Sequence, residues 1–130
     1  ALEGALKLKE LSYIHASGYA AGELKHGPIA VLDQNVPVIT VLIPGAVYEK
    51  TLSNAQEARA RKAKMIALAV KGDEQAAKVF DSVQTVPAVE ELLSPMTVIV
   101  PLQLMSYFIS DYLGKDIDQP RNLAKSGTVE

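Results

Sequence analysis

Residues 1–28 have the sequence ALEGALKLKELSYIHASGYAAGELKHGP, which is the most informative stretch of the chain. Its first part is rich in Ala and Leu, which are strong helix formers, and it contains no Pro, so it predicts a helix over residues 2–13. Glu3, Lys7 and Glu10 follow one another at intervals of four and three residues, so they lie within roughly 60° of each other around this helix. The helix therefore carries one charged face on a mostly apolar surface.

This charged face, made of Glu3, Lys7 and Glu10, has two interpretations. An ordinary solvated face with i,i+4 Glu–Lys pairs would contribute only about 0.2–0.5 kcal/mol per pair. A charged face on an otherwise buried helix would instead have to meet a crevice, a partner or a ligand, because an isolated buried charge is costly. His26 precedes a Gly-Pro turn, an exposed position at which acid–base side chains are often found.

Composition restricts the class of protein. The 130 residues suit one domain spanning 1–130, and a 48% hydrophobic content is enough for a core. A net charge of −2 gives no indication of nucleic-acid binding. The absence of Cys excludes disulfides and thiolate metal sites. We see no signal peptide, and we expect no apolar run near the ~20 residues of a membrane span, so we predict a cytoplasmic protein that binds no membrane.

Strand and helix patterns alternate along the chain. Runs of mostly apolar residues predict buried parallel strands at 36–43 and 64–70, and a third, shorter strand is predicted at 82–86, ended by Pro87. This alternation predicts an α/β fold with a mostly parallel sheet. No phosphate-loop, dinucleotide or metal-ligand motif is present, so we predict neither metal nor cofactor. The other expected elements are a short strand at 13–19, a short helix at 23–30, an amphipathic helix at 46–61 with Val47, Leu52, Ala55 and Ala58 inward, and a turn at 71–74.

A long helix is predicted over residues 92–113, ended by Gly114. The apolar residues expected in the core are Met96, Val100, Leu104, Met105, Phe108 and Tyr112. The polar tail at 115–130 would, on its own composition, be a flexible terminus.

Two segments carry a resemblance to a known family. Both the opening ALEGALKLKELSYIHASGYAAGELKHGP and the closing DIDQPRNLAKSGTVE resemble the second sugar-isomerase (SIS) domain of the glutamine–fructose-6-phosphate aminotransferases, also called glucosamine-6-phosphate synthases. The resemblance implies a three-layer αβα, SIS-type (flavodoxin-like) domain. Judged against the family, we expect the opening strand of the domain, the first SIS domain and the glutaminase domain to be absent from this sequence.

The resemblance also implies an activity. The family makes glucosamine 6-phosphate and glutamate from fructose 6-phosphate and glutamine, and therefore needs a base, a ring-opening group and a Schiff-base amine. The matching positions are Glu10 for proton transfer between C1 and C2, His26 for ring opening, and Lys125 for the Schiff base. Substrate-binding positions implied in the same way are Glu3, Lys7 and Ala124.

Partners follow from the same resemblance. The family's histidine reaches the site from a neighbouring subunit, so His26 implies a homodimer. The family holds the sugar phosphate with Ser and Thr residues of its first SIS domain, so we expect this chain to be inactive alone. Two alternatives stay open, which are a non-catalytic SIS module that binds a phosphosugar and a module that only dimerises.

Overall fold

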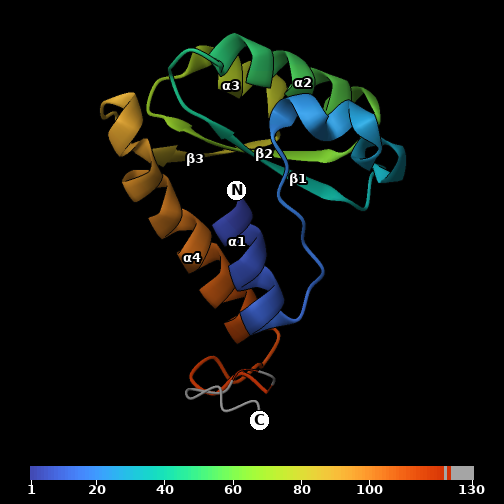
Figure 1. Cartoon of the computed structure of the whole chain (residues 1–130), viewed down its shortest axis with the longest axis vertical. Helices are drawn as coiled ribbons and strands as arrows, with labels where there is room; N and C mark the ends of the chain where they lie inside the picture. The colour runs from blue at the N-terminus through green and yellow to red at the C-terminus, as the bar shows by residue number, and fades with distance from the viewer. Residues whose placement is uncertain (122, 124–130) are drawn as a thin grey trace. The chain divides into compact units, whose positions relative to one another are not determined.

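The computed structural model of this protein describes residues 1–121 and residue 123 (Figure 1). Contacts divide the chain into two compact units. The sheet unit contains Ala1 and Tyr19–Pro101, and the α1 unit contains Leu2–Gly18 and the residues from Leu102 onward.

The sheet unit is built on three parallel strands in the order β1-β2-β3. These strands are β1 (Pro37–Leu42), β2 (Lys64–Val70) and β3 (Ser82–Val86), and both neighbouring pairs are parallel. All three strand predictions are confirmed; β1 and β2 are runs of mostly apolar residues, whereas β3 (sequence SVQTV) is largely exposed and buries only Val86. The parallel pairing confirms the predicted α/β class.

Two helices pack on the sheet. Figure 1 shows α2 (Tyr48–Ala60) and α3 (Glu74–Val79) on the same face of the strands, and both helices contact β2. The core between them includes Leu42 and Met65, which are fully buried. The predicted helix at 46–61 is confirmed, with Leu52, Ala55 and Ala58 buried. Val47 was expected inward but is exposed, because it lies at the N-cap before the first helical turn.

Two local predictions were wrong, and one helix was missed. Residues 13–19 have no strand, and 23–30 form two 3₁₀ helices, η2 (Ala21–His26) and η3 (Pro28–Val31), instead of one continuous helix. Gly27, at φ 143° between them, and Pro28 separate the two helices. The helix α3 was missed, although Asp73 followed by Glu74 is a helix-start signal.

The α1 unit opens with the predicted helix, but the last turn differs from an α-helix. Helix α1 (Leu2–Lys7) continues directly into a π-helical turn, η1 (Leu8–Ser12), which ends at Tyr13 in the left-handed region with φ 60°. Gly4 lies against Leu102, since an added Cβ would be only 3.0 Å from that side chain. This close approach fixes the helix that carries Glu10 against the second half of α4.

Helix α4 (Ser94–Tyr112) follows the short η4 (Glu91–Leu93) and runs from the sheet unit into the α1 unit. Its buried residues are Val98, Leu102, Ser106 and Ser110, at intervals of four. The opposite face was predicted to be the core and is instead largely exposed, as shown by Met96, Val100, Leu104, Phe108 and Tyr112.

The buried serines give the physical reason for this reversal. Ser106 donates its hydroxyl to the carbonyl of Leu102 at 3.1 Å, and Ser110 donates to the carbonyl of Ser106 at 2.8 Å. A small hydroxyl that is satisfied within its own helix can be buried at little cost and allows a neighbour to approach closely.

The segment Glu91–Tyr112 is long and apolar enough, by length and composition alone, to cross a membrane. The expectation that no apolar run approaches that length was therefore wrong. One such helix is weak evidence of a membrane span, since core helices of soluble proteins can reach the same length and hydropathy.

Candidate functional site

The predicted charged face is assembled on α1 and η1. Lys7 Nζ lies 2.6 Å from Glu10 Oε2 and 3.8 Å from Glu3 Oε1, so one ammonium group bridges two carboxylates. The side chains of Glu3, Lys7 and Glu10 are 43%, 30% and 23% exposed, so burial deepens toward Glu10. The structure therefore brings together three of the six predicted site residues.

The short contact with Glu10 controls the charge of Lys7. The hydrogen bond to Glu10 raises the pKa of Lys7 above its ordinary value, and the charges of Glu10 and Glu3 act in the same direction. Lys7 is therefore held as an ammonium ion at neutral pH. The Lys7 ammonium donates a hydrogen bond to Oε2 of Glu10. Within the described part of the chain, Oε1 of Glu10 has no hydrogen-bond partner.

Glu10 lies in the π-helical turn rather than in the α-helix. Ser12, in the same turn, donates its hydroxyl to the carbonyl of Leu8 at 2.6 Å. A single π turn inside a helix changes the direction of its side chains and is frequent at functional sites. The sequence pattern predicted a continuous helix here, because composition does not distinguish α from π hydrogen bonding.

His26 belongs to the other compact unit, at the end of η2. Its Nδ1 lies 2.8 Å from Glu23 Oε2, and its side chain is 71% exposed. An imidazole paired with a carboxylate at the surface is available to a partner or ligand. The remaining predicted residues, Lys125 and Ala124, lie outside the residues that the structure describes.

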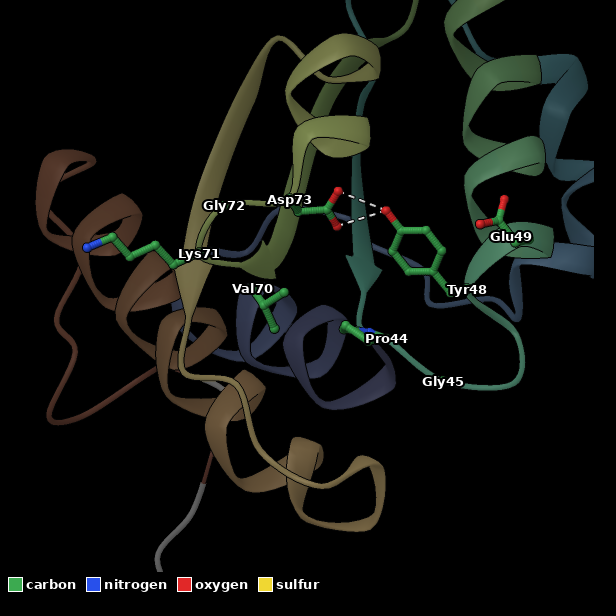
Figure 2. A pocket seen from close by; sticks show the side chains of 8 residues that line it. All are labelled: Pro44, Gly45, Tyr48, Glu49, Val70, Lys71, Gly72 and Asp73. Carbon is green, nitrogen blue, oxygen red and sulfur yellow. Dashed lines mark hydrogen bonds between the residues drawn. The ribbon is translucent and has the colours of Figure 1, made fainter.

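An open hollow of about 450 Å³ lies at the carboxyl ends of β1 and β2. Figure 2 shows the Tyr48 and Asp73 side chains directed toward one another there, and the phenol donates to both carboxylate oxygens at 2.8 and 2.9 Å. Burial and then the bond to Asp73 raise the pKa of Tyr48 to about 12. The hollow is lined by Pro44, Gly45, Tyr48, Glu49, Val70, Lys71, Gly72 and Asp73.

Sequence reasoning missed this hollow because it interpreted residues 71–74 only as a turn. Ligands of parallel α/β sheets commonly bind beyond the carboxyl ends of the strands. In this chain, however, the two polar side chains satisfy each other, and Asp73 also accepts from the backbone N–H of Ala76 at 2.9 Å. Their role is therefore to join the first turns of α2 and α3.

Both the sequence and the fold of this chain are similar to those of known proteins. The SIS domain family model matches residues 1–109. All 130 residues align at 62% identity with the glutamine–fructose-6-phosphate aminotransferase [isomerizing] of Gloeobacter violaceus, and at 58% with that of Thermus thermophilus. The chain spans 21% and 22% of these two relatives, about one fifth of their length.

A solved structure gives the same result. The C-terminal domain of glucosamine-fructose-6-phosphate aminotransferase from Francisella tularensis is similar with a TM-score of 0.83 and 43% sequence identity. The match covers 91% of this chain and 33% of that one, and it confirms the predicted SIS-type α/β fold. The chain belongs to the SIS domain family, and it is homologous to the C-terminal domain of the glutamine–fructose-6-phosphate aminotransferases.

Proposed function

We propose that this domain performs the sugar-isomerising half of a glutamine–fructose-6-phosphate aminotransferase. Its substrate would be fructose 6-phosphate and its product glucosamine 6-phosphate, with nitrogen supplied from glutamine by a separate glutaminase domain. The names of the relatives that match the whole chain support this proposal. The main structural support for this function is the Lys7–Glu10 pair, which holds a partly buried carboxylate in a fixed orientation.

Glu10 has the chemistry required of the base. Moving a proton between C1 and C2 of an open-chain sugar requires one group that removes it and returns it on the neighbouring carbon. Lys7 holds one oxygen of Glu10, which fixes the carboxylate and leaves the other oxygen to face the substrate. In this role Glu3 and Lys7 would also contact sugar hydroxyls.

Lys125 and His26 complete the proposed chemistry. The Lys125 amine would add to the C2 carbonyl of the open-chain ketose and release water, giving a Schiff base from which ammonia displaces the lysine. His26 would open the sugar ring by moving a proton between the ring oxygen and the anomeric hydroxyl. Ala124, next to Lys125, would line the substrate site.

The direct test uses the longer protein that contains this chain. We expect Glu10→Gln to lower formation of glucosamine 6-phosphate by about 10²–10⁴-fold, because a general base is lost, while glutamine hydrolysis is largely retained. Glu90→Gln is a matched control, since Glu90 is an exposed glutamate in the segment before η4. Normal isomerisation by Glu10→Gln would refute the assignment of the base.

A homodimer is the second part of the proposal. His26 is exposed and paired only with Glu23 among the described residues, which suits a group that completes a site on another subunit. Closed dimers are the commonest soluble assemblies. Mixing inactive Glu10→Gln and His26→Ala proteins, followed by subunit exchange, should restore part of the activity, because some sites then receive both intact residues. No recovery after demonstrated exchange would place His26 in its own subunit's site.

A cytoplasmic location is also proposed. It is consistent with the metabolic reaction named for the relatives and with a sequence that contains no Cys.

A further inference from the structure

Glu23 and His26 form a carboxylate–imidazole pair on the short helix η2. His26 Nδ1 lies 2.8 Å from Glu23 Oε2, and the side chains of His26 and Glu23 are 71% and 62% exposed. Their helix is of the 3₁₀ type, and its first turn is closed by a bond from the Glu23 N–H to the Ala20 carbonyl at 2.9 Å. Residues three apart eclipse one another in a 3₁₀ helix, so the backbone itself places the carboxylate beside the imidazole.

The hydrogen bond between these side chains determines which ring nitrogen of His26 is free. An ionised carboxylate only accepts hydrogen bonds, so the neutral imidazole carries its hydrogen on Nδ1 and its lone pair on Nε2. Among the residues that the structure describes, no group bonds to Nε2 of His26. The nitrogen that can exchange a proton with a ligand is therefore Nε2.

The other two faces of η2 hold it on the sheet unit. Three residues per turn give η2 three faces, and one of them carries Glu23 and His26. Leu24, on the second face, packs against the buried core cluster of the sheet unit. Lys25, on the third face, has its Nζ 2.6 Å from Glu57 Oε1 on α2. Figure 1 shows the blue segment that contains η2 beside α2, with which it is in contact. The pair is therefore presented to solvent by a helix whose own position is held.

We propose that Glu23 is a positioning residue for ring opening, which holds the His26 imidazole so that Nε2 exchanges the proton of the sugar. This inference rests on the proposed function, in which His26 opens the ring of fructose 6-phosphate. In this step Nε2 accepts the proton of the C2 hydroxyl, the C2–O5 bond breaks as the C2 carbonyl forms, and the proton is returned to O5. Protons and electron pairs balance without a further reactant.

The carboxylate of Glu23 supports this step in two ways. It fixes the tautomer and the orientation of the ring, and its charge stabilises the imidazolium that exists while Nε2 holds the proton. Glu23→Gln keeps an oxygen that can accept from Nδ1 but removes the charge, whereas Glu23→Ala removes both. Because an exposed pair contributes little to stability, both variants should fold like the parent.

The kinetic experiment uses the longer protein that contains this chain and two substrates, fructose 6-phosphate and 5-deoxyfructose 6-phosphate. The analogue lacks the hydroxyl that closes the ring, so it is always open-chain and needs no ring opening. With fructose 6-phosphate we expect Glu23→Ala to lower kcat/KM of amino-sugar formation by about 10–10²-fold, a part of what an acid–base group contributes, and Glu23→Gln to lose less. With the analogue both variants should keep the parental kcat/KM. Equal losses with the two substrates would show general damage and overturn the positioning role.

The variant His26→Gln separates this inference from the proposed function. Parental formation of the amino sugar from fructose 6-phosphate by His26→Gln would overturn the proposed role of His26, and that of Glu23 with it. A loss in His26→Gln with a parental kcat/KM in Glu23→Ala would overturn the positioning role alone. Glu90→Gln, at an exposed glutamate, is the matched control and should keep parental values for both substrates.

A spectroscopic measurement tests the orientation of the ring without turnover. The ¹⁵N resonances of His26 in the longer protein, assigned by comparison with His26→Gln and recorded where the ring is neutral, distinguish the Nδ1–H tautomer from the Nε2–H tautomer. We expect the Nδ1–H form in the parent and in Glu23→Gln, and a shift toward the Nε2–H form in Glu23→Ala. An Nε2–H form in the parent, or an unchanged tautomer in Glu23→Ala, would overturn the positioning role and leave the proposed function in place.

Discussion

The phenol of Tyr48 donates a hydrogen bond to both carboxylate oxygens of Asp73, at 2.8 and 2.9 Å, and so joins two helices that follow different strands. Tyr48 is in the first turn of α2, and Asp73 is the N-cap of α3. One carboxylate therefore satisfies a side-chain hydroxyl and a backbone N–H at the same edge of the sheet.

This pair predicts a pH dependence of stability. Burial and the bond to Asp73 raise the pKa of Tyr48 from 10.0 to about 12, so the folded state holds the phenolic proton more tightly than the unfolded chain. The contribution is complete below the ordinary pKa and is lost as pH rises toward 12. We expect the free energy of unfolding in urea to fall less steeply above pH 10 in Tyr48→Phe than in the parent. Tyr112→Phe, at an exposed tyrosine, should retain the parental slope, and a parental slope in Tyr48→Phe would contradict the prediction.

Asp73 should matter more as a cap than as a charge. Asp73→Ala removes both the N-cap and the partner of Tyr48, and we expect it to lower the free energy of unfolding by about 1–3 kcal/mol. Asp73→Asn keeps a side-chain oxygen that can accept from the Ala76 N–H, so its loss should be smaller. Urea titration of both variants measures the difference, and equal losses would show that the charge, not the cap, dominates.

Gly4 determines how closely the helix that carries Glu10 approaches α4. An added Cβ would lie 3.0–3.3 Å from three atoms of Leu102, which is 4% exposed. We expect Gly4→Val to lower the free energy of unfolding by about 1–3 kcal/mol, the cost of overpacking. In Gly4→Val/Leu102→Ala the space for the new side chain returns, so the double-mutant cycle should show a favourable coupling. Additive effects would mean that the two residues do not compete for space.

Lys7 should support Glu10 through position and charge. In the longer protein we expect Lys7→Met to lower kcat of isomerisation by up to about 10²-fold, because a carboxylate displaced by ~1 Å loses its alignment with the substrate. Lys7→Arg, which keeps a positive charge, should lose less. Lys9→Met is the matched control, since Lys9 is an exposed neighbour on the same turn. Equal kcat values for Lys7→Met and Lys9→Met would remove Lys7 from the site.

The local pattern of the sequence was sufficient to predict the positions of the strands and the charged face of Glu3, Lys7 and Glu10. The β1 and β2 segments are short runs rich in β-branched and other apolar residues, which favour a strand, and the predicted bounds of all three strands agree with the structure to within one residue. The spacing of Glu3, Lys7 and Glu10 fixes them on one side of any helix, so their contact also followed from sequence. Both features depend only on neighbours within a few residues.

Tertiary structure alone decided which side of α4 is buried and what the end of the first helix contacts. Helix α4 has apolar residues on more than one side, so hydrophobicity alone did not show which side is buried. Close packing buries the side that contains Ser106 and Ser110. The π-helical turn and the left-handed Tyr13 are equally invisible in composition, and so is the contact of the Tyr13 ring with the Arg121 guanidinium at 4.1 Å, across 108 positions of the sequence. Residues far apart in sequence carry no signal of their contact until the chain has folded.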